Sequence, residues 1–178
     1  MEARPITYDN LDLAVATHNG IFPYATARNN YLDAIEGRMD GEYSLLYNDD
    51  TLVGVSGIYF VKDDPEAAWL GWFGILPAFR RRYLGREALN MFERDAKARG
   101  FRYTRLYTDA NNNEIAIRFY ESNGYIPEAH NNKSDLAAAG EPLLIFSKSL
   151  DGSIIPQWHS RPLGMAEQMR KQAIPVID

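Results

Sequence analysis

One stretch of the sequence decides the fold: Ile75-Leu76-Pro77-Ala78-Phe79-Arg80-Arg81-Arg82-Tyr83-Leu84-Gly85-Arg86. It places three consecutive arginines directly before an amphipathic run of helical spacing. The positive end of a helix dipole repels cations, so this arrangement costs stability unless an anion lies there. Free N–H groups at a helix N-terminus also make a ready phosphate site. The stretch therefore predicts a ligand that carries phosphate.

The elements on either side of this stretch are the clearest in the chain. The pattern predicts a helix over 85–98, ended by Gly100, and a buried strand over 67–75. Gly71 and Gly74 lie inside that strand. Interior glycines mark a bulge, the close approach of a ligand, or tight packing under a helix, and the sequence does not choose among these.

The rest of the chain alternates strands and helices. Further strands are expected at 3–7, 44–47, 52–61, 104–108, 125–129 and 143–150, and further helices at 11–20, 25–36 and 114–123. A turn at Asn48-Asp49-Asp50 predicts a hairpin, Asn111-Asn112-Asn113 supplies a helix N-cap, and the polar segment 130–141 is expected to be a loop. This order predicts an α/β fold in which helices pack against a mixed sheet.

The chain length suits one domain, which we expect over 1–150. The segment 151–178 differs in composition from the rest of the chain: it contains three prolines, and a short helix is expected over 165–173. We interpret it as a C-terminal extension that packs on the domain or on a partner subunit. Its apolar residues would not stay in water; they are Ile154, Ile155, Trp158, Leu163 and Met169.

Composition excludes several classes of protein. The formal net charge of −5 argues against general affinity for nucleic acid or anionic membranes, although basic residues gather between Arg80 and Arg105. The absence of cysteine excludes disulfides and thiolate catalysis, and no metal site is expected. The longest uncharged run, 67–79, is too short to span a bilayer. The first five residues have no apolar core typical of a signal peptide, so a cytoplasmic location is expected.

Neither standard nucleotide-binding signature occurs in the chain. Instead, the stretch Ile75 to Gly85 resembles motif A of the GNAT superfamily of acyl-CoA-dependent N-acetyltransferases, V-x-P-x-[YF]-R-[GR]-[KR]-G-[IL]-G. The stretch Asn113-Glu114-Ile115-Ala116-Ile117-Arg118-Phe119-Tyr120-Glu121-Ser122-Asn123-Gly124-Tyr125 is similar to motif B of that family. The two motifs stand in the family's order and spacing, and the resemblance covers roughly Ile6 to Leu150.

The resemblance implies a site for acetyl-CoA as co-substrate. Backbone groups of Phe73, Gly74 and Ile75 would bind the pantetheine arm, where two parallel strands splay apart. Backbone amides of the loop and first helical turn would bind the diphosphate, with the arginine side chains available for the 3′-phosphate; these residues are Arg80, Arg81, Arg82, Tyr83, Leu84, Gly85 and Arg86. Asn113 would contact the cofactor chain, with Phe119 packing nearby.

The resemblance also implies that Tyr120 protonates the leaving thiolate. A phenol with a pKa of about 10 suits that role. The competing interpretation of Tyr120 is a core aromatic residue. The amine must lose a proton before it attacks, so a general base or an ordered water path is expected. Glu66 is the first candidate; Asp64, Glu128 and His130 are others, and each also fits a plain surface charge.

The sequence departs from motif A at Tyr83, and the resemblance also indicates where the acceptor amine would bind. Tyr83 stands where the family has glycine, so its side chain must point outward if the loop is to approach phosphate. The segment that shapes the acceptor site in this family contains Phe22, Tyr24 and Tyr31. These three residues would line the acceptor pocket, or would belong to the core of two amphipathic helices.

These observations favour direct transfer of acetyl from acetyl-CoA to a primary amine of a small molecule or peptide. One alternative is a catalytically inactive acyl-CoA-binding module of the same fold, suggested by Tyr83. The other is a protein that binds phosphate or nucleic acid through the basic helix, which the net charge disfavours. The apolar tail is compatible with a homodimer.

Overall fold

The structure is a computed structural model that describes residues 1–25, 27–111 and 113–165. Its contacts divide the chain into two compact units, Met1–Phe101 and Arg102–Asp178. The expected boundary at residue 150 stays a prediction. The expected helix over 165–173 falls almost wholly outside the described residues, as does Met169.

The first unit contains a four-stranded antiparallel sheet in the order β1-β2-β3-β4. Its strands are β1 (Glu2–Pro5), β2 (Gly41–Asn48), β3 (Thr51–Phe60) and β4 (Ala67–Ile75). Its helices are α1 (Leu11–Ile21), α2 (Arg28–Ile35) and α3 (Leu84–Ala98), with 3-10 turns η1 (Tyr8–Asn10) and η2 (Pro77–Phe79). The hairpin turn between β2 and β3 is confirmed, since Asp49 and Asp50 both have positive φ, as a two-residue hairpin requires.

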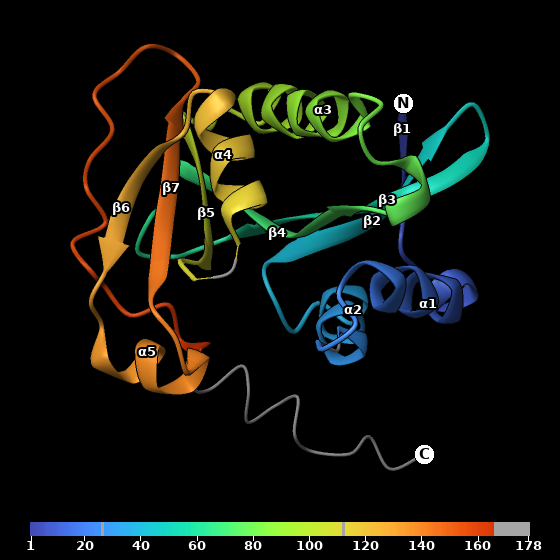
Figure 1. The fold of residues 1–178 in the computed structure, drawn as a ribbon, viewed down its shortest axis with the longest axis horizontal. Coiled ribbons are helices and arrows are strands. Elements are labelled where there is room, and N and C mark those ends of the chain that lie inside the picture. The colour runs from blue at the N-terminus through green and yellow to red at the C-terminus, as the bar shows by residue number, and fades with distance from the viewer. Residues whose placement is uncertain (26, 112, 166–178) are drawn as a thin grey trace. The chain divides into compact units, whose positions relative to one another are not determined.

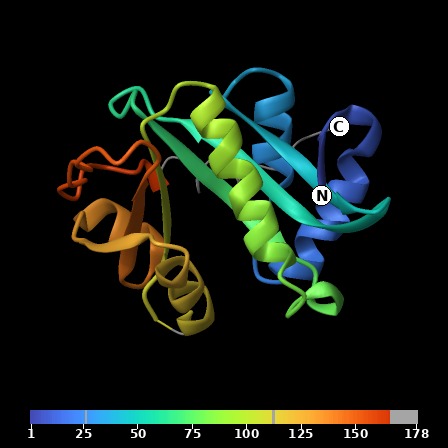
Figure 2. The ribbon, with the colours of Figure 1, turned by 90° about the horizontal axis from the view of Figure 1, so that it is seen from above.

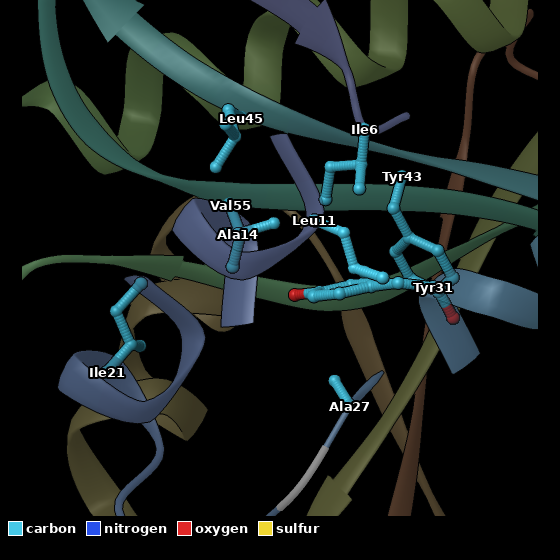
Figure 3. Close-up of a cluster of buried hydrophobic side chains, with 9 residues drawn as sticks. All are labelled: Ile6, Leu11, Ala14, Ile21, Ala27, Tyr31, Tyr43, Leu45 and Val55. Atoms are coloured by element: carbon cyan, nitrogen blue, oxygen red, sulfur yellow. The ribbon is translucent and has the colours of Figure 1, made fainter. Parts of the chain in front are cut away.

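Helices cover both faces of this sheet. Figure 1 shows α1 and α2 on one side of β2–β4 and α3 on the other, and Figure 2 shows α3 running across the strands. Side-chain alternation along β2 places Leu45 toward α1 and α2 and Leu46 toward α3. In β3, Val55 faces α1 and α2 whereas Val53 faces α3, because Leu46 pairs with Gly54 and Tyr47 with Leu52, which leaves Val53 as the extra residue of a bulge. Figure 3 shows the first of these clusters.

The second unit contains an antiparallel sheet in the order β5-β7-β6. Its elements are β5 (Tyr103–Asp109), α4 (Glu114–Ser122), β6 (Ile126–His130), α5 (Lys133–Ala139) and β7 (Leu143–Ser149). Helix α5 corrects the expected loop over 130–141: Asn132 caps it by accepting the N–H groups of Ser134 and Asp135, and Gly140, with φ of 74°, ends it. The expected splay of two parallel strands concerns β4 and β5, which belong to different units, and stays a prediction.

The segment after β7 packs on its own unit up to residue 165. Trp158 is buried, and its ring lies between the guanidinium groups of Arg105 and Arg161, at 5.9 and 3.9 Å. Ile154, in contrast, is 94% exposed, so the expectation that it would be removed from water is wrong. Trp158 therefore supplies the main apolar anchor of this segment.

Candidate functional site

The loop between β4 and α3 has the backbone geometry of an anion site. Arg81 and Tyr83, which directly precede and follow Arg82, have φ angles of 62° and 63°, in the left-handed region. Left-handed residues in such a loop turn successive N–H groups toward a common concavity. Among the described residues, no side chain caps the N-terminus of α3. These backbone groups and the helix dipole therefore fit a diphosphate.

The three arginines of this loop differ in what they contact. Arg80 donates from Nε to the carbonyl oxygen of Ile75 at 2.9 Å. The guanidinium of Arg82 lies 5.8 Å from the centre of the Phe79 ring. Arg81 is exposed. The side chain of Arg80 thus closes the turn after β4, and those of Arg81 and Arg82 reach the surface.

Tyr83 occupies the position that the resemblance assigns to glycine, and the structure gives the reason for glycine there. A left-handed conformation costs a residue with a side chain about 1–2 kcal/mol. The side chain of Tyr83 is 82% exposed, so the ring points into solvent as expected. The loop can therefore hold its shape with tyrosine, at the expense of backbone strain.

The end of β4 contains a bulge. Gly74 pairs with Val55 and Gly71 pairs with Gly57, so Trp72 and Phe73 lie opposite the single residue Ser56. A Cβ atom on Gly74 would lie 2.5 Å from Cγ2 of Ile21. Two of the three readings of the interior glycines, a bulge and tight packing under a helix, are thus confirmed. A close ligand approach stays a prediction.

The expected acceptor-site residues have three different surroundings. Tyr31 is fully buried in the core, and its hydroxyl lies 3.2 Å from Nδ1 of His18. Phe22 is half-buried, with its ring 5.4 Å from that of Trp72. Tyr24 is fully exposed. The structure brings Phe22 and Tyr31 together around His18, and leaves Tyr24 apart from them.

His18 is a buried residue that the sequence did not single out for a role. Its ring has no exposed surface and packs edge-on against Trp72, with centroids 4.6 Å apart. Burial lowers the pKa of His18 to about 4, with a smaller opposing effect from the Ala25 backbone. The imidazole is therefore neutral at physiological pH.

In the second unit, Tyr120 lies on α4 with its ring packed against Phe119, Tyr125 and Phe146. The residue is 8% exposed, and no described residue hydrogen-bonds its hydroxyl group. Burial raises the pKa of Tyr120, so the phenol stays protonated at neutral pH. A buried ring with an unbonded hydroxyl is compatible with a proton donor.

Asn113 is the N-cap residue of α4, as expected, but its side chain does not cap the helix. Its Nδ2 donates to Oγ1 of Thr108, at the end of β5. Phe119, one turn and a half further along α4, is half-buried. The amide of Asn113 is thus oriented by the neighbouring strand.

The structure separates the four candidates for the general base. Glu66 is exposed and precedes β4, seven residues before Phe73, or about 23 Å along an extended strand. Asp64 is buried and accepts the indole N–H of Trp69 at 3.0 Å. The structure therefore does not bring Glu66 to the bulge of β4, and it gives Asp64 a structural partner.

Of the other two candidates, Glu128 holds the segment after β7 directly, and His130 contacts Asp135, which also holds that segment. The two carboxylate oxygens of Glu128 accept the backbone N–H groups of Trp158 and His159, each at 2.8 Å. His130 is buried, with Nε2 2.9 Å from Asp135. Asp135 also accepts the N–H groups of Leu163 and Met165.

Two further properties concern the described part of the chain. No cluster of three or more His, Asp or Glu side chains there could hold a metal ion. No helix in the same ranges has the length and apolarity needed to cross a membrane.

Comparison with known proteins gives a consistent result. The profile of the acetyltransferase (GNAT) family matches residues 9–125. A search of curated proteins gives no match. Among solved structures, the ribosomal-protein-S18-alanine N-acetyltransferase of Escherichia coli is similar at a TM-score of 0.65 and 18% identity, over 88% of this chain and 98% of that one.

Two other similar structures contain a ligand. The PaiA N-acetyltransferase of Thermoplasma acidophilum, in complex with coenzyme A, gives a TM-score of 0.63 at 18% identity, over 83% of this chain and 98% of that one. Naa50 of Arabidopsis thaliana, in complex with the bisubstrate analogue CoA-Ac-MVNAL, gives a TM-score of 0.66 at 21% identity, over 83% of this chain and 97% of that one. These similarities confirm the expected α/β fold class.

Proposed function

Because the chain belongs to the GNAT family of acetyltransferases, we propose that it transfers an acetyl group from acetyl-CoA directly to a primary amine. The observation that carries the proposal is the loop before α3, where Arg81 and Tyr83 are left-handed and no described side chain caps the helix. Backbone amides from Arg81 to Arg86 hold the diphosphate, and the exposed arginine side chains neutralise its charge.

The chemistry needs one bond to form and one to break. Acetyl-CoA supplies an activated acyl group, the amine nitrogen forms a bond to its carbonyl carbon, and the carbon–sulfur bond breaks. We assign Tyr120 as the acid that protonates the departing thiolate, because its buried phenol keeps its proton at neutral pH. Asn113 and Phe119 contact the cofactor chain near this acid.

The amine also has to lose a proton. Glu66, the first candidate for the base, directly precedes β4 and so lies at the opposite end of that strand from Phe73. An ordered water path to solvent is the better proposal, since it needs no side chain at the bulge. Substitution of Glu66 by Gln that leaves the pH–rate profile unchanged would support the water path.

The acceptor class has two candidates. Of the similar structures, one is a ribosomal-protein-S18-alanine N-acetyltransferase, and another is in complex with the analogue CoA-Ac-MVNAL, which carries a peptide sequence. A peptide amine therefore belongs beside small-molecule amines in any test. An inactive acyl-CoA-binding module is the second candidate function, and the strained Tyr83 is the observation that favours it.

Two measurements test the proposed function. Acetyl-CoA should raise the melting temperature by mass action, whereas adenosine should not. Thiol release can then be followed over a panel of polyamines, aminoglycosides and peptides. Because the chain has no cysteine, a thiol reagent reports only the released CoA. No thermal shift at millimolar acetyl-CoA would disprove the cofactor assignment, and binding without turnover of any amine would favour the inactive module.

A further inference from the structure

Trp72 is the strained residue of β4. Its φ of 38° lies in the left-handed region, where a bulge of this type usually has glycine. Such a backbone persists only when its surroundings hold it in place. Trp72 also directly precedes Phe73, Gly74 and Ile75, whose backbone groups are proposed to bind the pantetheine arm.

The side chain of Trp72 is held by three contacts from α1 and α2. Its indole Nε1 donates to Oδ1 of Asn30 at 3.3 Å. Its ring packs edge-on against His18 at 4.6 Å and lies 5.4 Å from Phe22. Neutral His18 is itself positioned by the hydroxyl of Tyr31. Residues of α1 and α2, and Phe22 directly after α1, thus fix the position of the Trp72 ring, and Trp72 is one of the two residues that form the bulge.

The neighbouring side chain points to the other face. Phe73 packs in the cluster beside α3, with Leu46, Val53 and Ile75, whereas Trp72 packs in the cluster beside α1 and α2. The peptide between the two residues therefore has one side chain anchored in each layer. Because Trp72 and Phe73 lie opposite the single residue Ser56, the register with β3 is irregular here, and the two side-chain anchors help to set the orientation of this peptide.

We infer that Trp72 is a positioning residue for the acyl-CoA site, and that its indole bond to Asn30 fixes the orientation of the backbone at Phe73 and Gly74. This inference rests on the proposed function. Its consequence is a coupling between α2, which carries the expected acceptor-site residue Tyr31, and the strand proposed to bind the cofactor. A change at Asn30 should weaken acetyl-CoA binding although the residue lies on a helix that holds no cofactor-binding position.

The test compares Trp72→Phe and Asn30→Ala with Trp69→Phe. Trp69 is a matched control because it lies three residues earlier on β4, is fully buried and also donates its indole N–H, to Asp64. We expect Trp72→Phe and Asn30→Ala each to raise the Kd for acetyl-CoA by roughly tenfold, as loss of one oriented contact does. The double variant should have a Kd for acetyl-CoA no higher than that of the single variant that binds more weakly, because both substitutions remove the same hydrogen bond. Trp69→Phe should lower the melting temperature and leave the Kd unchanged.

A second readout needs no cofactor. Amide hydrogen exchange over residues 72–76 of the free protein should be faster in Trp72→Phe and Asn30→Ala than in the wild type, and unchanged in Trp69→Phe. Unchanged exchange and Kd in both variants, or an equal loss of affinity in Trp69→Phe, would overturn the inference. Faster exchange in the two variants, together with a wild-type protein that binds no acetyl-CoA, would instead remove the proposed function and leave only a structural role for Trp72.

Discussion

Arg80 donates a hydrogen bond of 2.9 Å from its Nε to the carbonyl oxygen of Ile75, five residues earlier in the chain. This bond ties the first residue of the basic loop to the last residue of β4. The side chain that electrostatics alone would assign to phosphate is therefore engaged by the protein. The anion-binding capacity of the loop lies in its backbone and in the two arginines that follow.

Arg80→Ala should lower the free energy of unfolding by about 1 kcal/mol, because it removes a hydrogen bond from a charged donor that is itself solvent-exposed. Arg81→Ala is the matched control and should leave stability within about 0.5 kcal/mol. Urea unfolding measures both. Equal stability of the two variants would show that the Arg80–Ile75 bond does not close the turn.

Tyr83→Gly should be more stable than Tyr83→Ala by about 1 kcal/mol, since glycine adopts the left-handed conformation without a Cβ penalty. Comparing these two variants isolates the backbone effect, because the exposed ring is removed in both. Thermal unfolding in the absence and presence of acetyl-CoA checks the effect. If Ala matched Gly, the loop would not need a left-handed residue at position 83.

His18 should make stability depend on pH. Its folded pKa, about 4, lies below its ordinary value near 6.5, so the unfolded chain binds more protons between these values. The contribution is fully present above pH 6.5 and is lost as the pH falls toward 4, by about 3 kcal/mol in all. Denaturant unfolding from pH 7 to pH 4 measures it.

His18→Gln should be less stable than the wild type at pH 7, and the difference should shrink at pH 4. His159→Gln is the control, because His159 is exposed. A constant difference between wild type and His18→Gln across this range would contradict the buried neutral imidazole.

Tyr120→Phe should lower kcat by about 10²-fold or more with little change in the Kd for acetyl-CoA, as expected when a general acid is removed. Tyr103→Phe is the control, since Tyr103 is another buried tyrosine of the same unit. Steady-state kinetics with an amine identified by the panel, together with calorimetry for acetyl-CoA, separate the two parameters. An unchanged kcat would exclude Tyr120 from the mechanism.

The sequence predicted the fold well where local signals agree. The helix over 84–98 combines apolar spacing with Gly100 in the left-handed region, and the hairpin at Asp49 and Asp50 has turn residues that tolerate positive φ. The short helix α5 was missed because its alanines carry no helical periodicity, although Asn132 and Gly140 mark its two ends. Those end signals could have identified it.

The candidate site was predictable only in part, for a physical reason. Motif spacing indicates the loop before α3 and Tyr120, because local backbone geometry fixes both. It does not reveal that His18 meets Trp72, since such a contact depends on how α1 packs on β4. Glu66 likewise appeared close to the site in sequence, but strand length places it at the far end of β4.

Glu128 and Asp135 together accept four main-chain N–H groups from the segment between Trp158 and Met165. The two carboxylates thus hold this segment through its backbone, and Trp158 is the one side chain between residues 158 and 165 that is deeply buried. Evolutionary drift should therefore spare the two carboxylates, the indole, Arg161, whose guanidinium stacks on that indole, and Gly164, whose φ is 74°. A peptide of foreign sequence that kept Trp158, Ser160, Arg161 and Gly164 could be grafted along the same route.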